Sequence, residues 1–212
     1  MMLRRILHNN NHIYYILLTY IDLSVDEPEE FMRRVRTLAE VLHKSIIVQV
    51  IDADNIAGLE HLLEVLTQSL EAERRSCLLA KRVEVDILLR LACTRQISDA
   101  IERVGLRRGR SKAVLVVMIH EEGEETVNLH NMLMKFKDKL KVMDGVIKVY
   151  DNDSYSYSNG VRVEGGDEGK GYKHVYEHLT SVYGLSEQEL TSCISSNRLV
   201  SILAERANLL HR

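Results

Sequence analysis

His174, Glu177 and His178, in the sequence HVYEH, have the H-x-x-E-H spacing of inverted zinc proteases. Two histidines four residues apart share a helix face and can bind one zinc ion, with the glutamate as general base. Such a site needs a further ligand from later in the chain. The carboxylates that follow are Glu187, Glu189 and Glu205. An exposed polar helix face explains the motif without a metal, so we predict no metal site.

The sequence GGDEGKGY, from Gly165, resembles a phosphate-binding loop, but it departs from the required pattern. The spacing to Gly169 is one residue short, and Gly171 follows Lys170 where a hydroxyl should reach magnesium. A flexible linker is the better interpretation. Cys93 lies on an apolar helix face and is predicted to be a buried small hydrophobe. No catalytic set emerges from these spacings, so we predict a non-enzymatic chain without cofactors.

A further set of residues could contact the phosphates of RNA. Basic side chains attract phosphates, and a glutamine can bond a base edge or a sugar. Solvated surface charge explains the same residues, and the sequence leaves both interpretations open. The candidates are Lys81, Arg82, Arg95, Gln96, Arg107, Arg108, Arg110 and Lys112.

Composition limits the classes of protein to which the chain can belong. Of the 212 residues, 45% are hydrophobic and 28% charged, which predicts a packed core. A net charge of −3 excludes a globally basic nucleic-acid binder, so any RNA contact must be local. Three cysteines without a C-x-x-C pair favour free thiols in a reducing cytoplasm. The basic start and the apolar run IYYILLTYI lack a cleavage motif, which favours a first strand over a signal peptide, and we predict no membrane segment.

Hydrophobic periodicity predicts alternating strands and helices. Expected strands cover residues 12–23, 45–51, 112–119 and 146–150. Expected helices cover residues 28–43, 59–75, 76–92, 97–104, 127–142, 172–183 and 196–210. Among the expected caps are Asp52 or Asp54 before the second helix, Gly105 as a left-handed C-cap, and Ser186 with Glu189 as a capping box.

The order of these elements indicates an α+β fold, with a small mixed or antiparallel sheet flanked by several helices. The helical run between the second and third strands is too long for a standard crossover of a parallel sheet. The strand KAVLVVMI shows little alternation, which predicts a central position. We expect a single domain over residues 1–212, with an insertion or mobile segment at about 121–171 that includes a polar loop or hairpin.

The centre of the chain carries a family resemblance. The run EVDILLRLACTRQISDAIERVGL resembles the signature segment of the kinase-binding subunits of the KEOPS complex, which include the human p53-related-protein-kinase-binding protein and archaeal relatives. The upstream VIDADNIAGLEHL and the final LVSILAERANLL resemble that family in the same order. Cys93 and Thr94 stand where many archaeal members carry Ser-Gly, a mild departure. The resemblance covers residues 45–119 and 183–210, and it identifies an archaeal-type member.

The resemblance implies a non-catalytic regulatory subunit that docks on the small atypical kinase/ATPase of KEOPS. It also implies help in recruiting tRNA, through its 3′ end, for threonylcarbamoyladenosine modification. Apolar stripes on the second central helix and the terminal helix are either core or kinase interface. The candidate interface residues are Ile101, Val104, Leu106, Leu199, Leu203, Arg206 and Leu210. The alternative function is a stand-alone RNA-binding module that uses the basic run from Arg107 to Lys112.

Overall fold

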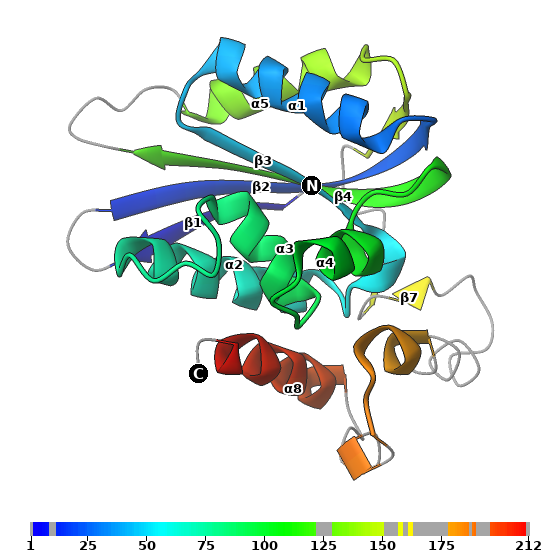
Figure 1. Ribbon diagram of the computed structural model, residues 1–212. Helices are drawn as coiled ribbons and strands as arrows, with labels where there is room; N and C mark the ends of the chain where they lie inside the picture. Colours follow the sequence, from blue (N-terminus) through cyan, green and yellow to red (C-terminus); the bar gives the residue numbers. More distant parts are fainter. Residues whose placement is uncertain are drawn as a thin grey trace. The chain divides into compact units, whose positions relative to one another are not determined.

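The computed structural model describes residues 2–8, 12–121, 129–150, 157–158, 161–162, 178–186, 188–189 and 196–210 (Figure 1). The chain divides into two compact units, each made of two separate segments. Unit 1 consists of Met1–Asp52 and Leu106–Tyr155, and unit 2 of Ala53–Gly105 and Ser156–Arg212. The single domain expected for residues 1–212 stays a prediction. The α+β class is confirmed, because unit 1 is built on an antiparallel sheet and unit 2 is mainly helical.

Unit 1 contains a five-stranded sheet in which four strands follow the order β1-β2-β4-β3 and β5 pairs with β2. All its pairings are antiparallel, and the strands are β1 (Met2–His8), β2 (His12–Val25), β3 (Ile46–Asp52), β4 (Gly109–Glu121) and β5 (Val146–Val149). The predicted central position of β4 is confirmed, since it lies between β2 and β3. Its residues 113–119 are all buried, which is why this strand shows no polar alternation.

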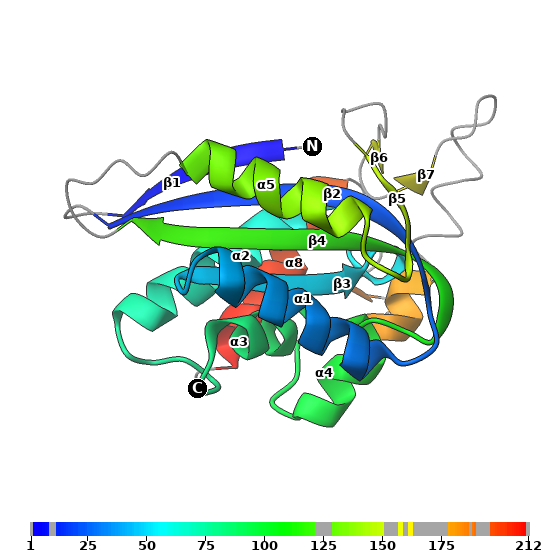
Figure 2. The ribbon, with the colours of Figure 1, turned by 90° about the horizontal axis from the view of Figure 1, so that it is seen from above.

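Helices α1 (Pro28–Leu42) and α5 (Leu129–Lys141) lie side by side over one face of this sheet (Figure 2). Their apolar stripes meet the odd-numbered side chains of β2 in one core. The members that the helices contribute include Phe31, Val35, Ala39, Leu133, Phe136 and Leu140. Pro28 occupies the first turn of α1, where no N–H is required, and Glu29 and Glu30 suit the positive end of the helix.

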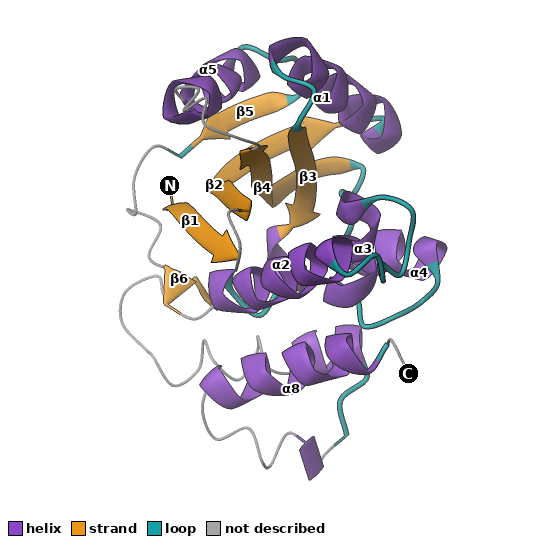
Figure 3. Ribbon diagram, turned by 90° about the vertical axis from the view of Figure 1, so that its left-hand side faces the viewer, coloured by secondary structure: helices purple, strands orange, loops and turns teal. Residues whose placement is uncertain are grey.

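Unit 2 contains α2 (Leu59–Arg74), α3 (Val83–Leu91), α4 (Ile97–Val104) and α8 (Ser196–Leu209). Helix α8 packs along α2 and α3 (Figure 3). A short helix, η1 (Ala53–Asn55), precedes α2, and residues 178–183 are also helical. Strands β6 (Tyr157–Ser158) and β7 (Val161–Arg162) pair as a hairpin, within the segment predicted as a loop or hairpin. The rest of the expected insertion, apart from α5 and β5, lies mostly outside the described residues.

Three local predictions were wrong. Neither Asp52 nor Asp54 caps α2, whose N-cap is Gly58 at a φ of 99° without a side-chain bond. Gly105 is extended, with φ −74° and ψ 169°, and it is needed because a Cβ there would lie 2.4 Å from the Ile101 carbonyl oxygen. The helix expected from residue 76 begins only at Val83, because the segment before it forms a loop.

A buried ion pair holds the helices of unit 2 together. Arg90 Nε donates to Asp86 Oδ2 at 2.6 Å, and the two side chains are 1% and 0% exposed. The other carboxylate oxygen, Oδ1, accepts the N–H of Leu79 at 2.6 Å, and Arg90 Nη1 donates to the Ala207 carbonyl at 3.4 Å. The pair therefore joins the loop before α3, α3 itself and the last turns of α8.

We predict that Arg90→Ala destabilises the protein by about 3–5 kcal/mol, because it leaves the Asp86 carboxylate buried and unpaired. Urea unfolding followed by circular dichroism measures the loss. Arg33→Ala is the matched control, since Arg33 pairs with Glu30 at 2.6 Å on the surface and its loss should change little. Equal midpoints for the two variants would contradict the assigned role of the buried pair.

Candidate functional site

The turn between α3 and α4 sets the direction of α4. Cys93 adopts a left-handed conformation, with φ 51°, immediately after α3 ends. The N–H of Thr94 donates to the Leu89 carbonyl at 3.0 Å, which satisfies one of the last carbonyls of α3. From α4, Arg103 Nη1 donates back to the Ala92 carbonyl at 3.1 Å. These bonds fix α4 against the turn.

Helix α4 is amphipathic but leaves two apolar side chains on its outer face. Ala100 and Val104 are buried, whereas Ile97 and Ile101, one turn apart, are each 51% exposed. Two half-exposed isoleucines on one helix face form a small exposed apolar patch, which is a candidate docking surface. We call this pair the α4 face. A periodicity of 3.6 residues places both on one side, although only Ile101 is among the interface residues predicted from the sequence.

The structure divides the predicted kinase-interface residues between core and surface. Val104, Leu199 and Leu203 are buried, so they pack inside the protein and are not available to a partner on its surface. Leu106 is partly buried against the core of unit 1. Of the seven, Ile101 alone has a large exposed apolar side chain, since Leu210 is partly buried.

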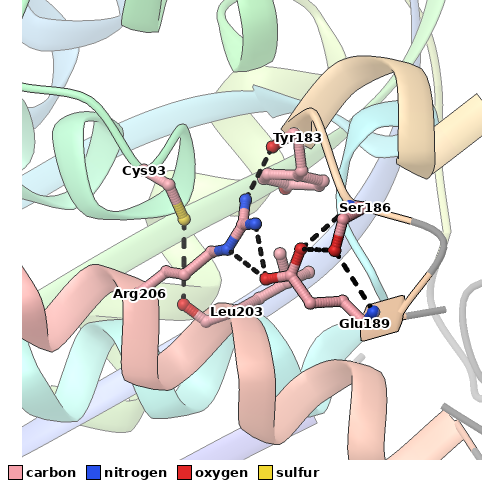
Figure 4. Close-up of polar contacts among 6 residues, drawn as sticks. All are labelled: Cys93, Tyr183, Ser186, Glu189, Leu203 and Arg206. Atoms are coloured by element: carbon pink, nitrogen blue, oxygen red, sulfur yellow. Dashed lines mark hydrogen bonds and ion pairs between the residues drawn. The ribbon is translucent and has the colours of Figure 1, made fainter. Parts of the chain in front are cut away.

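Arg206, the charged member of the predicted interface, holds the segment before α8 in place (Figure 4). Its Nη1 donates to the Tyr183 carbonyl at 2.8 Å, and its Nη2 and Nε donate to Glu189 Oε1 at 2.6 and 3.2 Å. The predicted capping box is confirmed: Ser186 Oγ accepts the Glu189 N–H at 3.3 Å, and Glu189 Oε2 accepts the Ser186 N–H at 2.8 Å. We call these four residues the Arg206 cluster.

Cys93 lies beside this cluster. It was predicted to be a buried small hydrophobe, and in the structure it is partly buried. Its thiol donates to the Leu203 carbonyl at 3.7 Å (Figure 4). Burial raises the pKa of the Cys93 thiol to about 11, so the nucleophilic thiolate is scarce at neutral pH. The thiol therefore packs against its neighbours and donates a weak hydrogen bond.

Four of the predicted RNA-contact residues lie in unit 2. Lys81 and Arg82 are exposed in the loop before α3, and Arg82 forms an ion pair with Glu84. Arg95 Nε donates to the Leu210 carbonyl at 2.7 Å, so this guanidinium caps the C-terminal end of α8. The Gln96 side chain is exposed.

The other four lie in unit 1, two of them before β4 and two on it. Arg107 Nε pairs with Asp52 Oδ2 at 3.2 Å. Arg110 and Lys112 share one face of β4, because they are two residues apart on the strand. Arg110 is exposed, as is Arg108, and Lys112 is half-buried. The basic run is therefore divided between the segment before β4 and one face of that strand.

The zinc-type motif is only partly described, since His174 and Glu177 lie outside the described residues, as does GGDEGKGY. A ring nitrogen of His178 lies 2.8 Å from Asn55 Oδ1, which gives this histidine a structural partner. Among the residues that the structure describes, no group of three His, Cys, Asp or Glu side chains could hold a metal. In the same part of the chain, no helix has the length and apolar character to span a bilayer.

A buried histidine escaped prediction from the sequence. His61 is fully buried, its Nδ1 accepts the Ala57 N–H at 3.4 Å, and it packs edge-on against Tyr183 with ring centroids 5.9 Å apart. Burial lowers the pKa of His61 to about 4, so it stays neutral at physiological pH. In the sequence, the position of His61 on the apolar face of α2 could have indicated that it is buried.

The Arg206 cluster predicts a pH dependence of stability. Hydrogen bonds from Ser186 and Arg206 lower the pKa of Glu189 from the usual 4.5 to about 2. A lowered carboxyl pKa stabilises the fold above the unfolded value, and this stabilisation is lost as pH falls from about 4.5 toward 2. Glu189→Gln should be less stable than the unmodified protein at pH 7 and should approach it near pH 2. Urea unfolding at several pH values across this range tests the prediction. A difference in unfolding free energy between the two proteins that does not change with pH would contradict it.

Comparison with known proteins places the chain in a family. A protein-family model described as "Kinase binding protein CGI-121" matches residues 28–201, which include α4 and, of the Arg206 cluster, Tyr183, Ser186 and Glu189. No curated protein matches the chain. The family match confirms the resemblance to the kinase-binding subunits of KEOPS. Because the match extends over most of the sequence, the chain belongs to the CGI-121 family of kinase-binding proteins.

Proposed function

We propose that the protein is a non-catalytic regulatory subunit of the cytoplasmic KEOPS complex. In this role it binds the small atypical kinase/ATPase of the complex and helps to recruit tRNA for threonylcarbamoyladenosine modification. The observation that carries the proposal is the family match over residues 28–201. The α4 face supports it by offering an exposed apolar surface within that range.

The α4 face is our proposed centre of the kinase interface. Ile97 and Ile101 each expose half of their surface, and covering the remainder would contribute roughly 1 kcal/mol per side chain. Leu209, on the last turn of α8, is 45% exposed. The bond from Arg95 to the Leu210 carbonyl joins the turn before α4 to the end of α8. The two helix ends can therefore contribute to one docking surface.

We predict that Ile101→Glu weakens kinase binding by at least about 2 kcal/mol, or roughly thirtyfold in Kd, because a carboxylate would be buried without a partner. Titration calorimetry with the purified kinase measures the change, and circular dichroism checks folding. Val142→Glu is the matched control, since Val142 is 85% exposed in unit 1.

Two outcomes would decide against this assignment. Equal kinase affinities for Ile101→Glu, Val142→Glu and the unmodified protein would move the interface away from α4. An unmodified protein that binds tRNA but not the kinase would instead favour the stand-alone RNA-binding module.

The tRNA part of the proposal concerns the unpaired 3′ end. We predict that the protein binds intact tRNA more tightly than tRNA trimmed of its 3′ tail, because unpaired nucleotides expose phosphates and base edges together. Gel-shift titrations at two salt concentrations compare the two ligands. Indistinguishable affinities would reject recognition of the tail, while leaving kinase binding unaffected.

A further inference from the structure

We propose that Glu102, on helix α4, is a charged contact at the border of the kinase interface and pairs there with a lysine or arginine of the kinase. The inference rests on the proposed function, which puts the α4 face at the centre of that interface. Glu102 was not among the interface residues predicted from the sequence. The proposal also describes the partner surface, which is an apolar groove for Ile97 and Ile101 with a cationic side chain at its edge.

Glu102 lies beside the α4 face. It follows Ile101 directly, and both side chains are exposed. Successive residues of an α-helix are turned by about 100° around its axis, so Glu102 borders Ile101 on the side away from the buried Ala100 and Val104. A partner that covers Ile97 and Ile101 therefore reaches Glu102 at the edge of the contact area.

The position of this carboxylate is unfavourable for the helix itself. Glu102 is in the last turn of α4, where the unpaired carbonyls carry partial negative charge. Asp99 lies three residues earlier, a spacing at which side chains are neighbours on a helix surface, so the two like charges repel each other. Both effects raise the free energy of the folded protein on its own.

No contact within the described part of the chain offsets this cost. Glu102 forms no ion pair and no side-chain hydrogen bond with any described residue. Arg103, the basic residue of the same turn, donates to the Ala92 carbonyl at the end of α3, at 3.1 Å. Glu189, by contrast, is paired with Arg206 at 2.6 Å. An exposed carboxylate that destabilises its helix and has no partner among the described residues indicates a partner on another molecule.

A cation of the kinase would remove both unfavourable effects on binding. Its charge would pair with the Glu102 carboxylate and would also face the negative end of α4. At the border of an interface, a charge pair affects mainly the association rate and the choice of partner, whereas well-packed side chains at the centre supply most of the affinity. Glu102 therefore contributes to specificity, and Ile97 and Ile101 to affinity.

The test compares Glu102→Gln with Glu40→Gln. Glu40 is the matched control, because it is an exposed glutamate in the last turn of α1, in unit 1, and each variant removes one negative charge. Surface plasmon resonance with the purified KEOPS kinase, at several salt concentrations, measures the association and dissociation rates. We expect Glu102→Gln to lower the association rate constant several-fold at low salt and to reduce its salt dependence. Glu40→Gln should behave like the unmodified protein.

Urea unfolding of the same variants gives a second readout with the opposite sign. Glu102→Gln should unfold at the same urea concentration as the unmodified protein or at a higher one, because it removes the repulsion from Asp99 and from the helix end. A variant that is at least as stable but binds the kinase more slowly has lost a contact with its partner and no part of its own fold. A lower unfolding midpoint for Glu102→Gln would contradict the unfavourable position assigned to this carboxylate.

The outcomes separate this inference from the proposed function. If the kinase binds the unmodified protein, Glu102→Gln and Glu40→Gln at equal rates, the role of Glu102 is wrong while kinase docking stands. If both variants lose the same share of the association rate, binding follows overall charge and the role of Glu102 is likewise wrong. If the unmodified protein does not bind the kinase, the docking proposal and this inference both fail.

Discussion

The carbonyl groups of α8 are the constraint on which unit 2 depends. The last carbonyls of a helix have no partner within it, and here neighbouring elements supply donors at the end of α8 and also one turn earlier, at Ala204. Gln68 of α2 donates to Ala204 at 3.0 Å, Arg90 of α3 to Ala207 at 3.4 Å, and Arg95 to Leu210 at 2.7 Å. Two of these donors are arginines, which also suit the negative end of the helix dipole. Helix α8 is therefore held by its backbone as well as by its apolar side chains, and α3 and α4 take their positions from the same contacts.

This arrangement explains which parts of the fold the sequence could predict. Helices α1, α2, α4, α5 and α8 were found because each has one apolar stripe, and the strands β2, β3, β4 and β5 because their runs are β-branched. The capping box of Ser186 and Glu189 was found because it is a local pattern with fixed spacing. Strand β1 was missed, since MLRRILH has no strand pattern of its own and becomes a strand by pairing with β2. The prediction that Asp52 caps α2 was wrong because Asp52 is the last residue of β3 and its carboxylate pairs with Arg107.

The candidate sites were harder to predict, for physical reasons that differ between apolar and basic residues. Helix α8 is apolar over more than half of its circumference, and periodicity alone does not separate core from interface. Leu203 proved to be core, whereas Ile101 is on the surface. For basic residues, the missing information is the partner. Arg95 and Arg206 bind carbonyls and a carboxylate from distant parts of the sequence. The sequence alone could not show these partners, and it made Arg95 a candidate RNA contact and Arg206 a candidate interface residue.

The same reasoning applies to the distribution of cations on this acidic chain. With a net charge of −3, the field of the whole molecule does not attract RNA. Exposed charges act over about 10 Å at ordinary ionic strength, so cations help one another only when they lie within that distance. Lys112 and Lys148 are 36 residues apart in the sequence, and antiparallel pairing on both sides of Asp22 brings them within that range. Antiparallel pairing of three strands thus brings together cations that no continuous stretch of the sequence displays, and strand register, more than composition, reveals such a group.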